Sequence, residues 1–123
     1  MSKTILIVDD SRSLRTIVNM ALTRAGYAVL EAGDGLEALA VLNKTPKVHL
    51  IVSDLNMPNM DGFDFVQKVK AHPKHKFAPV IMLTTESNED KKQKGKVAGA
   101  KAWIVKPFLP PQLLEAVSKL IMP

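Results

Sequence analysis

Residues 4–10 read Thr-Ile-Leu-Ile-Val-Asp-Asp, a short run suited to a buried strand that ends in two carboxylates. A continuous rather than alternating apolar run is typical of a strand covered on both faces, as in a parallel sheet between layers of helices. Similar runs recur at residues 28–30, 50–52, 80–83 and 102–105. The sequence therefore predicts a sheet of five parallel strands.

Helical patterns fill the intervals between these runs. Apolar residues recur at helical spacing from Leu14 to Ala25, and Gly26 follows where a helix-ending residue belongs. Further helices are expected after Asp34, after residues 59–62, over residues 88–100 and from the pair Pro110-Pro111. The helix over residues 88–100 has few large apolar residues, so we expect it to be the least stable element. Strands and helices alternating five times predict a doubly wound, three-layer α/β domain.

The length and composition limit the kind of protein this is. At 123 residues we expect residues 1–123 to form a single domain, with any output module on another molecule. The 46% of hydrophobic residues is typical of a globular chain, and the absence of cysteine excludes disulfides and thiolate metal sites. The longest apolar run, residues 38–42, is far shorter than a membrane span, and no secretory signal pattern precedes the first strand. We expect a cytoplasmic protein without membrane insertion.

The chain is basic, with 17 Lys and Arg against 12 Asp and Glu, a net charge of +5 and a pI near 9.6. This balance permits attraction to nucleic acid, to an anionic membrane or to an acidic protein, but a solvated basic face is the simpler interpretation. The densest basic run, residues 91–96, has no aromatic residue on which bases could stack. We therefore expect no nucleic-acid partner.

Polar residues stand where the predicted strands end, which is where doubly wound sheets bind ligands. Asp9 and Asp10 follow the first run, Asp54 the third, Thr84 the fourth and Lys106 the fifth. Three converging carboxylates repel one another unless a cation neutralises them. Because only oxygen ligands are available, Mg²⁺ is favoured, and it leaves coordination positions for a phosphate.

Phosphoryl transfer is the chemistry that these residue types favour together. Lys106 offers a point charge for a phosphoryl oxygen and Thr84 a hydroxyl donor, while Asp54 on the central strand is the best candidate nucleophile. Any one of them alone could be a turn former, a helix cap or a loop lysine. Four strand ends that all carry what one phosphoryl site needs favour the joint interpretation.

Five motifs give the chain a resemblance to a known family. They are Ile-Leu-Ile-Val-Asp-Asp-Ser at 5–11, Asp-Gly-Leu-Glu-Ala-Leu at 34–39, Ser-Asp-Leu-Asn-Met-Pro-Asn-Met-Asp-Gly at 53–62, Leu-Thr-Thr-Glu at 83–86 and Trp-Ile-Val-Lys-Pro-Phe at 103–108. With them the chain resembles response-regulator receiver domains over essentially its whole length, and most of all the stand-alone members that act in chemotaxis. The resemblance implies a flavodoxin-like fold with strand order 2-1-3-4-5.

The resemblance also implies a phosphorylation site with one Mg²⁺ ion. Asp54 would receive the phosphoryl group, and Asp10 and Asp54 would coordinate the metal. Asp9 would hold a metal-bound water, and Asn56 would contribute its backbone carbonyl. Lys106 would pair with the phosphoryl group, through a cis peptide bond to the proline that follows it.

The same resemblance implies a switch next to this site. Thr84 would be the hydroxyl that moves toward the phosphorylated aspartate, and Trp103 the aromatic residue that swings inward with it. A tryptophan is larger than the Tyr or Phe more usual at this position, and receivers are more often acidic than basic. Asn59 and Glu86 flank the pocket at positions that tune hydrolysis of the phosphate.

We therefore expect a stand-alone response regulator that signals by phosphorylation-dependent binding, and not an ordinary enzyme. Its expected partners are a sensor histidine kinase, a flagellar motor switch protein and a phosphatase, and we expect a monomer. The alternative within the family is a phosphorelay intermediate that passes phosphate to a histidine phosphotransfer protein.

Three other patterns compete with this interpretation. Residues 33–38 match a G-x-G-x-x-A dinucleotide fingerprint, which makes a nucleotide-binding module a remote alternative, although it leaves the other strand ends without a role. A Mg²⁺-dependent hydrolase would typically separate the two aspartates after the first strand by one residue. His72 and His75 could form a weak metal pair, but we interpret them, with His49, as surface histidines.

Overall fold

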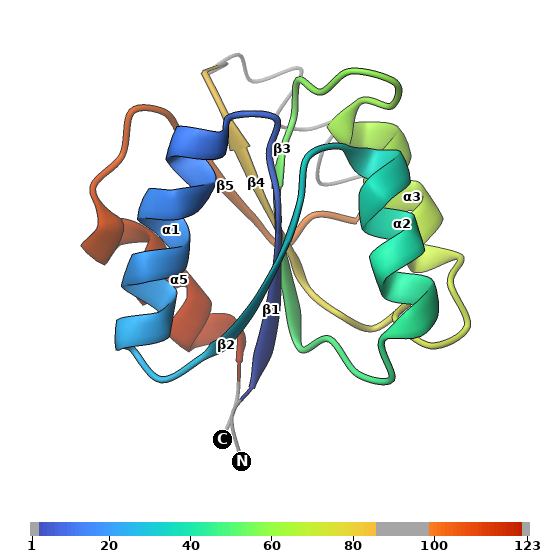
Figure 1. Cartoon of the computed structure of the whole chain (residues 1–123), viewed down its shortest axis with the longest axis horizontal. Coiled ribbons are helices and arrows are strands. Elements are labelled where there is room, and N and C mark those ends of the chain that lie inside the picture. The colour runs from blue at the N-terminus through green and yellow to red at the C-terminus, as the bar shows by residue number, and fades with distance from the viewer. Residues whose placement is uncertain (1–2, 86–98, 122–123) are drawn as a thin grey trace.

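The computed structural model describes residues 3–85 and 99–121 and shows one five-stranded parallel sheet in the order β2-β1-β3-β4-β5 (Figure 1). The strands are β1 (Thr4–Val8), β2 (Ala28–Ala32), β3 (Leu50–Asp54), β4 (Val80–Thr84) and β5 (Ala102–Val105). All four neighbouring pairs run parallel. The predicted fold class and strand order are confirmed.

Helices cover both faces of the sheet, α1 and α5 on one side and α2 and α3 on the other (Figure 1). Their bounds are α1 (Arg12–Arg24), α2 (Gly35–Lys44), α3 (Gly62–Lys70) and α5 (Pro110–Leu120). The helix expected over residues 88–100 lies outside the described residues except at its last two positions. Four of the five expected helices are thus present in the described part of the chain, and none of them is long and apolar enough to cross a membrane.

Local sequence signals set the helix ends. The side chains of Ser11, Asp34 and Asp61 accept hydrogen bonds from the first turns of α1, α2 and α3, as N-cap residues do. Gly26 follows α1 with a positive φ of 98°, a conformation that glycine adopts without steric cost. Helix α5 begins at Pro110, where the missing amide hydrogen costs nothing.

The core forms two apolar clusters, one on each face of the sheet. The inner strands β1, β3 and β4 are almost fully buried, as predicted. The same prediction is wrong for β2 and β5, which are partly exposed because they lie at the edges of the sheet. Strands β3 and β4 run further than the apolar runs that predicted them. Asp54 and Thr84 are consequently the last residues of these strands and are buried with them.

The prediction that His75 lies at the surface is wrong. Its side chain is buried, and its Nε2 lies 2.9 Å from the carbonyl oxygen of Leu42 and 3.0 Å from that of Thr45. Since a carbonyl only accepts, Nε2 carries the proton in this arrangement. His72 is half-buried, with its Nε2 2.9 Å from Asn43 Oδ1. Both histidines therefore fasten the segment after α3 to the end of α2.

Candidate functional site

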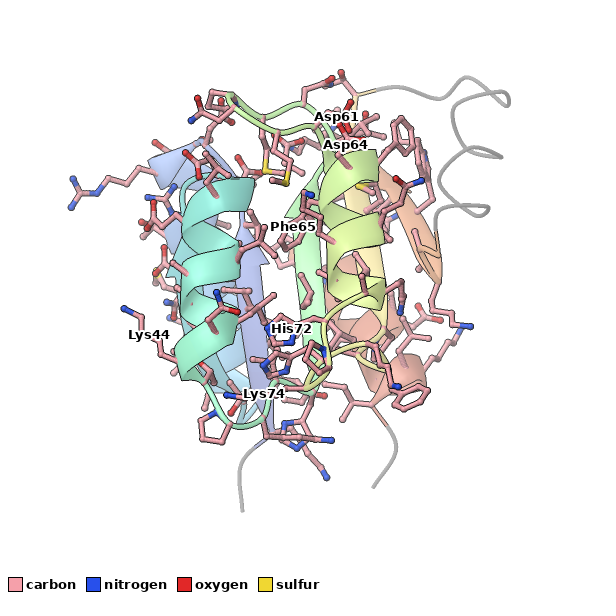
Figure 2. All side chains as sticks on the ribbon, turned by 90° about the vertical axis from the view of Figure 1, so that its right-hand side faces the viewer. Lys44, Asp61, Asp64, Phe65, His72 and Lys74 are labelled. Carbon is pink, nitrogen blue, oxygen red and sulfur yellow. The ribbon has the colours of Figure 1, made fainter. Side chains whose placement is uncertain are left out.

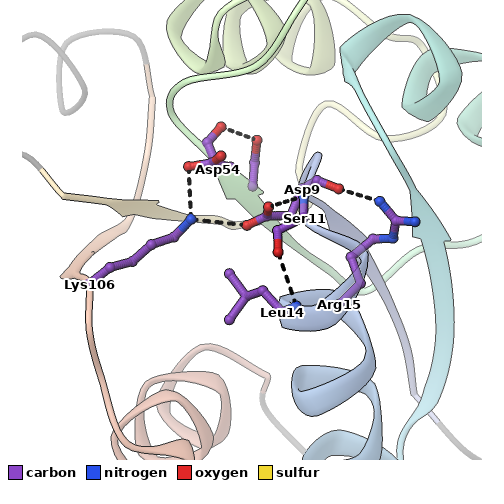
Figure 3. Close-up of polar contacts among 7 residues, drawn as sticks. Asp9, Ser11, Leu14, Arg15, Asp54 and Lys106 are labelled. Carbon is purple, nitrogen blue, oxygen red and sulfur yellow. Dashed lines mark hydrogen bonds and ion pairs between the residues drawn. The ribbon is translucent and has the colours of Figure 1, made fainter.

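Three of the predicted site residues, Asp9, Asp54 and Lys106, meet at the edge of the sheet where the strands end (Figure 3). Strands β1 and β3 are neighbours in register, with Val8 opposite Ser53, so the residues that come next, Asp9 and Asp54, are brought together. Lys106 follows β5 and reaches across the end of β4 to both carboxylates. Convergence of parallel strand ends thus produces the cluster that the sequence predicted.

One ammonium group bridges two buried carboxylates. Lys106 Nζ lies 3.1 Å from Asp9 Oδ2 and 3.2 Å from Asp54 Oδ1, and the side chains of Asp9 and Asp54 are only 1% and 7% exposed. Burial, and then the charge of Asp9, raise the pKa of Asp54 despite the nearby ammonium. Burial lowers the pKa of Lys106, but the charges of Asp54 and Asp9 outweigh it, so that this pKa is raised. Lys106 is therefore held as a cation.

The cluster retains an excess of negative charge. Asp9, Asp10 and Asp54 each offer a carboxylate oxygen within 4.8 Å of the other two, and Asp10 is exposed to solvent. Three carboxylates against one ammonium leave two negative charges, which a divalent cation would neutralise. Hard oxygen ligands in this number suit Mg²⁺. The donor set therefore fits the predicted ion.

The backbone around Asp54 is closely fitted. A Cβ added at Gly62 would lie 2.8 Å from the carbonyl oxygen of Asp54 and 2.8 Å from Leu55 Cα, so α3 packs directly against the end of β3. The amide of Asn56 hydrogen-bonds to the Asp54 side chain. The role of the Asn56 backbone carbonyl as a metal ligand stays a prediction.

Thr84 and Trp103 lie on the same face of neighbouring strands. Thr84 is completely buried at the end of β4, and Trp103 is half-buried on β5 opposite Met82, two residues before Thr84. The Trp103 ring stacks on Phe63 of α3, with ring centroids 6.3 Å apart. The peptide bond between Lys106 and Pro107 is cis, as predicted.

Of the two residues expected to tune hydrolysis of the phosphate, the structure describes Asn59 and not Glu86. Asn59 has a positive φ of 71°, and its amide donates to Asp34 Oδ2 at 3.0 Å. Hydrogen bonds from the Glu37 amide and from Asn59 lower the pKa of Asp34. Glu86 lies outside the described residues. The tuning role of both residues stays a prediction.

Sequence reasoning missed the contacts that hold Asp9. The Ser11 amide donates to Asp9 Oδ1 at 2.8 Å, and Arg15 of α1 donates to the Asp9 carbonyl oxygen. Arg15 is itself held by Glu31 of β2, with Nε 3.1 Å from Oε1. The Asp-x-Ser spacing is a signal for the first contact, because aspartate side chains commonly accept from the amide two residues on. The contacts of Arg15 depend on the folded structure.

The nucleotide-binding alternative does not fit α2. In that interpretation a pyrophosphate would occupy the N-terminus of the helix after Gly35. The carboxylate of Asp34 already accepts from the Glu37 amide there, at 2.8 Å, and would repel a phosphate. Hydrogen-bond donors at this helix end are therefore committed to the protein itself.

Comparison with known proteins agrees with the geometry. The family model of the response regulator receiver domain matches residues 5–118. A chemotaxis protein CheY homolog of Campylobacter jejuni is 41% identical over 118 residues, which cover 95% of this chain and 91% of the relative. The chemotaxis protein CheY1 of Helicobacter pylori is 42% identical over 112 residues, 90% of each chain.

A solved structure agrees in fold over nearly the full length. The chemotaxis response regulator CheY4 of Vibrio cholerae superposes with a TM-score of 0.92 and 47% identity, and the match covers 98% of this chain and 99% of the other. Family model, relatives and fold all identify the same family, and the acidic cluster with its bridging lysine lies within the matched residues. The chain belongs to the response regulator receiver domain family.

Proposed function

We propose that this protein is a chemotaxis response regulator that accepts a phosphoryl group on Asp54 and signals by binding a partner. The observation that carries the proposal is the single ammonium of Lys106 lying between the buried carboxylates of Asp9 and Asp54. Receiver-family membership and relatives named as chemotaxis proteins support the biological setting. In that setting the phosphodonor is a sensor histidine kinase and the target is the flagellar motor switch.

Asp54 would act as the nucleophile. One of its carboxylate oxygens forms a bond to phosphorus while the bond from phosphorus to the histidine nitrogen of the kinase breaks, and that nitrogen keeps the electron pair. Burial and the charge of Asp9 raise the pKa of Asp54, which reflects the cost of burying its carboxylate. Lys106 Nζ already contacts Asp54 Oδ1 and would pair with an oxygen of the incoming group.

The oxygens of Asp10 and Asp54, with the Asn56 carbonyl, would hold one Mg²⁺ ion, and Asp9 would hold a metal-bound water. When bound, the ion neutralises negative charge on the carboxylates and on the phosphoryl oxygens. Asp9 is fixed for this purpose by the Ser11 amide. Its other oxygen contacts Lys106 Nζ, so both carboxylate oxygens of Asp9 are held in place.

Transmission would begin at the buried hydroxyl of Thr84 and end at the exposed side of β5 and α5. Trp103 stands on the same face as Thr84 and also lines a surface groove of about 360 Å³ between β5 and α5. A shift of Thr84 toward phosphorylated Asp54 would therefore change the packing of Trp103 and the shape of this groove. The only chemistry required is gain and loss of the protein's own phosphate, in keeping with a signalling protein.

Intact-mass measurement with Mg²⁺ and acetyl phosphate tests the phosphorylation site. We expect one phosphoryl adduct in the wild type and none in Asp54→Asn. Asp61→Asn is the matched control, because Asp61 is an exposed carboxylate of the same loop that caps α3. An adduct that persists in Asp54→Asn, or no adduct in any variant, would contradict the proposal.

Binding to the flagellar motor switch protein tests the output. Phosphorylation should tighten this binding by about tenfold or more, followed through Trp103 fluorescence. Thr84→Ala should accept the phosphoryl group and lose most of that gain. Rapid transfer of the phosphoryl group to a histidine phosphotransfer protein, without any gain for the motor switch, would instead favour the phosphorelay alternative.

A further inference from the structure

The described charges separate along the strand direction. Every described acidic residue except Glu115 lies near the ends of strands, in the loops that follow them or in the first turns of helices. These residues are Asp9, Asp10, Glu31, Asp34, Glu37, Asp54, Asp61 and Asp64. Against these eight carboxylates stand Arg12, Arg15 and Lys106, so among the described residues the end that holds the phosphorylation pocket is acidic although the whole chain is basic.

The opposite end, where strands begin and helices finish, is basic. We call this surface the basic end, and its residues are Lys3, Arg24, Lys44, Lys47, Lys70, Lys74, Lys76 and Lys101. Favourable interaction with helix dipoles explains those of its residues that lie in last turns, Arg24, Lys44 and Lys70, as it does Lys68 and Lys119 in the last turns of α3 and α5. It does not explain the remaining lysines, which lie in the loops or just before strands.

The segment between α3 and β4 is held firmly at the basic end. Lys70 Nζ donates to the Ala78 carbonyl at 3.0 Å, and Lys74 Nζ donates to the Asn43 carbonyl at 3.2 Å. His75 is buried beneath it against the last turn of α2. Figure 2 shows Lys44, His72 and Lys74 together at this end of the two helices. The conformation of the segment is thus fixed by long-range contacts.

This held segment presents an aromatic ring to solvent. Phe77 is 87% exposed, and Lys76 Nζ lies 5.2 Å from the centre of its ring. The neighbouring residues that do pack inward, His75 and Ala78, show that the turn fixes which side chains are buried and leaves Phe77 outside. An exposed aromatic ring among lysines combines the two features of surfaces that rest on anionic lipid.

We propose that the basic end docks on an anionic lipid bilayer, with Phe77 at the level of the headgroups and the phosphorylation pocket facing away. A planar anionic surface matches lysines that are spread from β1 to β5 rather than aligned in a track. The separation of charge would orient the molecule as it approaches, because the acidic end is repelled. Docking in this pose leaves Asp54 accessible to a phosphodonor.

A nucleic acid fits these observations less well. Binding of single strands typically uses several aromatic side chains on which successive bases stack. The basic end offers Phe77, and the Lys76 ammonium already lies over its ring. The structure therefore favours a lipid surface, and a nucleic acid becomes an outcome that the test must separate.

Sedimentation of the protein with vesicles tests the proposal. We expect binding to phosphatidylcholine vesicles that contain about 30 mol% phosphatidylserine, none to pure phosphatidylcholine, and weakening with salt. Lys76→Gln should weaken binding by about fivefold. Arg12→Gln removes one exposed positive charge next to the acidic end and should leave binding unchanged.

A second pair of variants tests the aromatic ring. Phe77→Ser should weaken binding to the anionic vesicles, whereas Leu109→Ser, an exposed apolar residue 73% accessible at the start of α5, should not. Both substitutions are at exposed positions, so the fold is preserved. Equal effects of Lys76→Gln and Arg12→Gln would overturn the proposal. So would absence of vesicle binding, including the case in which the protein instead binds a single-stranded oligonucleotide in a Phe77-dependent manner.

Discussion

Lys106 is the residue on which the charge balance of the pocket depends. Its ammonium lies within 3.2 Å of two carboxylates that are themselves almost fully buried. Burying a carboxylate without a counter-charge is costly, and removal of one partner from a buried pair leaves that cost uncompensated. In the metal-free protein, Lys106 therefore provides neutralisation that a divalent ion would otherwise supply.

Lys106→Met should destabilise the metal-free protein at pH 7 by about 2 kcal/mol, less than for fully buried pairs because the ammonium is 20% exposed. Burial raises the pKa of Asp54, so acidification protonates it early and the deficit should shrink as the pH falls. Urea unfolding of both proteins at pH 7 and at an acidic pH measures the deficit and its change with pH. The control is Lys119→Met, whose exposed pair with Glu115 should contribute little. A deficit equal to that of the control would contradict the argument.

Ionisation of Asp34 stabilises the folded protein, whereas ionisation of the buried Asp54 carries a cost. Its folded pKa is lowered by the Glu37 amide and by Asn59, so its stabilisation is present above the ordinary pKa and is lost as the pH falls through the lowered value. Asp34→Ala should lower the melting temperature at pH 7 and less so in acid. Ser11→Ala also removes an N-cap, but one that does not titrate, so its effect should stay constant with pH. Parallel pH profiles for the two variants would contradict this expectation.

At the scale of elements, the approach of α3 to β3 holds the pocket in shape. Helices α2 and α3 both begin with a glycine, but the two glycines have different surroundings. A Cβ at Gly62 would meet the backbone of Asp54 and Leu55 at 2.8 Å, whereas a Cβ at Gly35 would meet the flexible side chain of Met60 at 2.9 Å. Backbone atoms at the end of a packed strand have little room to move.

Gly62→Ala should therefore destabilise the protein by about 3 kcal/mol, because the added methyl group overlaps the backbone at the end of β3. It should also slow phosphorylation, because Asp54 lies at this displaced strand end. Gly35→Ala, the matched variant, should cost less because Met60 can change rotamer. Urea unfolding and the rate of adduct formation from acetyl phosphate measure the two effects. If both variants behaved alike, the close approach of α3 would not be what shapes the pocket.

Elements with strong local signals and the meeting of the strand ends were predicted from the sequence, whereas other contacts between distant segments were not. The apolar runs, Gly26 and Pro110 mark their elements through short-range rules. The meeting of Asp9, Asp54 and Lys106 followed because parallel strands end at one edge of a sheet. By contrast, His75 reaches Leu42 across 33 residues of sequence, and nothing in its local pattern indicates burial.

At the scale of the whole molecule, a net charge of +5 conceals two ends of opposite sign. The sequence pattern could not reveal this separation, since it depends on which ends of strands and helices lie together. The acidic end would attract a divalent cation despite the basic total, because the field at the pocket is set by the nearest carboxylates. Global stability should consequently respond to Mg²⁺.

Mg²⁺ at about one hundred times its dissociation constant should raise the free energy of unfolding by about 2.7 kcal/mol relative to the chelator-treated protein. Asp54→Asn should lose most of this gain, whereas Asp61→Asn, outside the acidic cluster, should keep it. Lys106→Met should bind Mg²⁺ more tightly than the wild type, because the ammonium no longer competes for Asp9 and Asp54. Thermal unfolding across a Mg²⁺ titration measures all four proteins. Equal stabilisation of Asp54→Asn and Asp61→Asn by Mg²⁺ would mean that the ion binds elsewhere. A weaker affinity of Lys106→Met for Mg²⁺ would mean that the lysine arranges the carboxylates rather than competing with the ion for them.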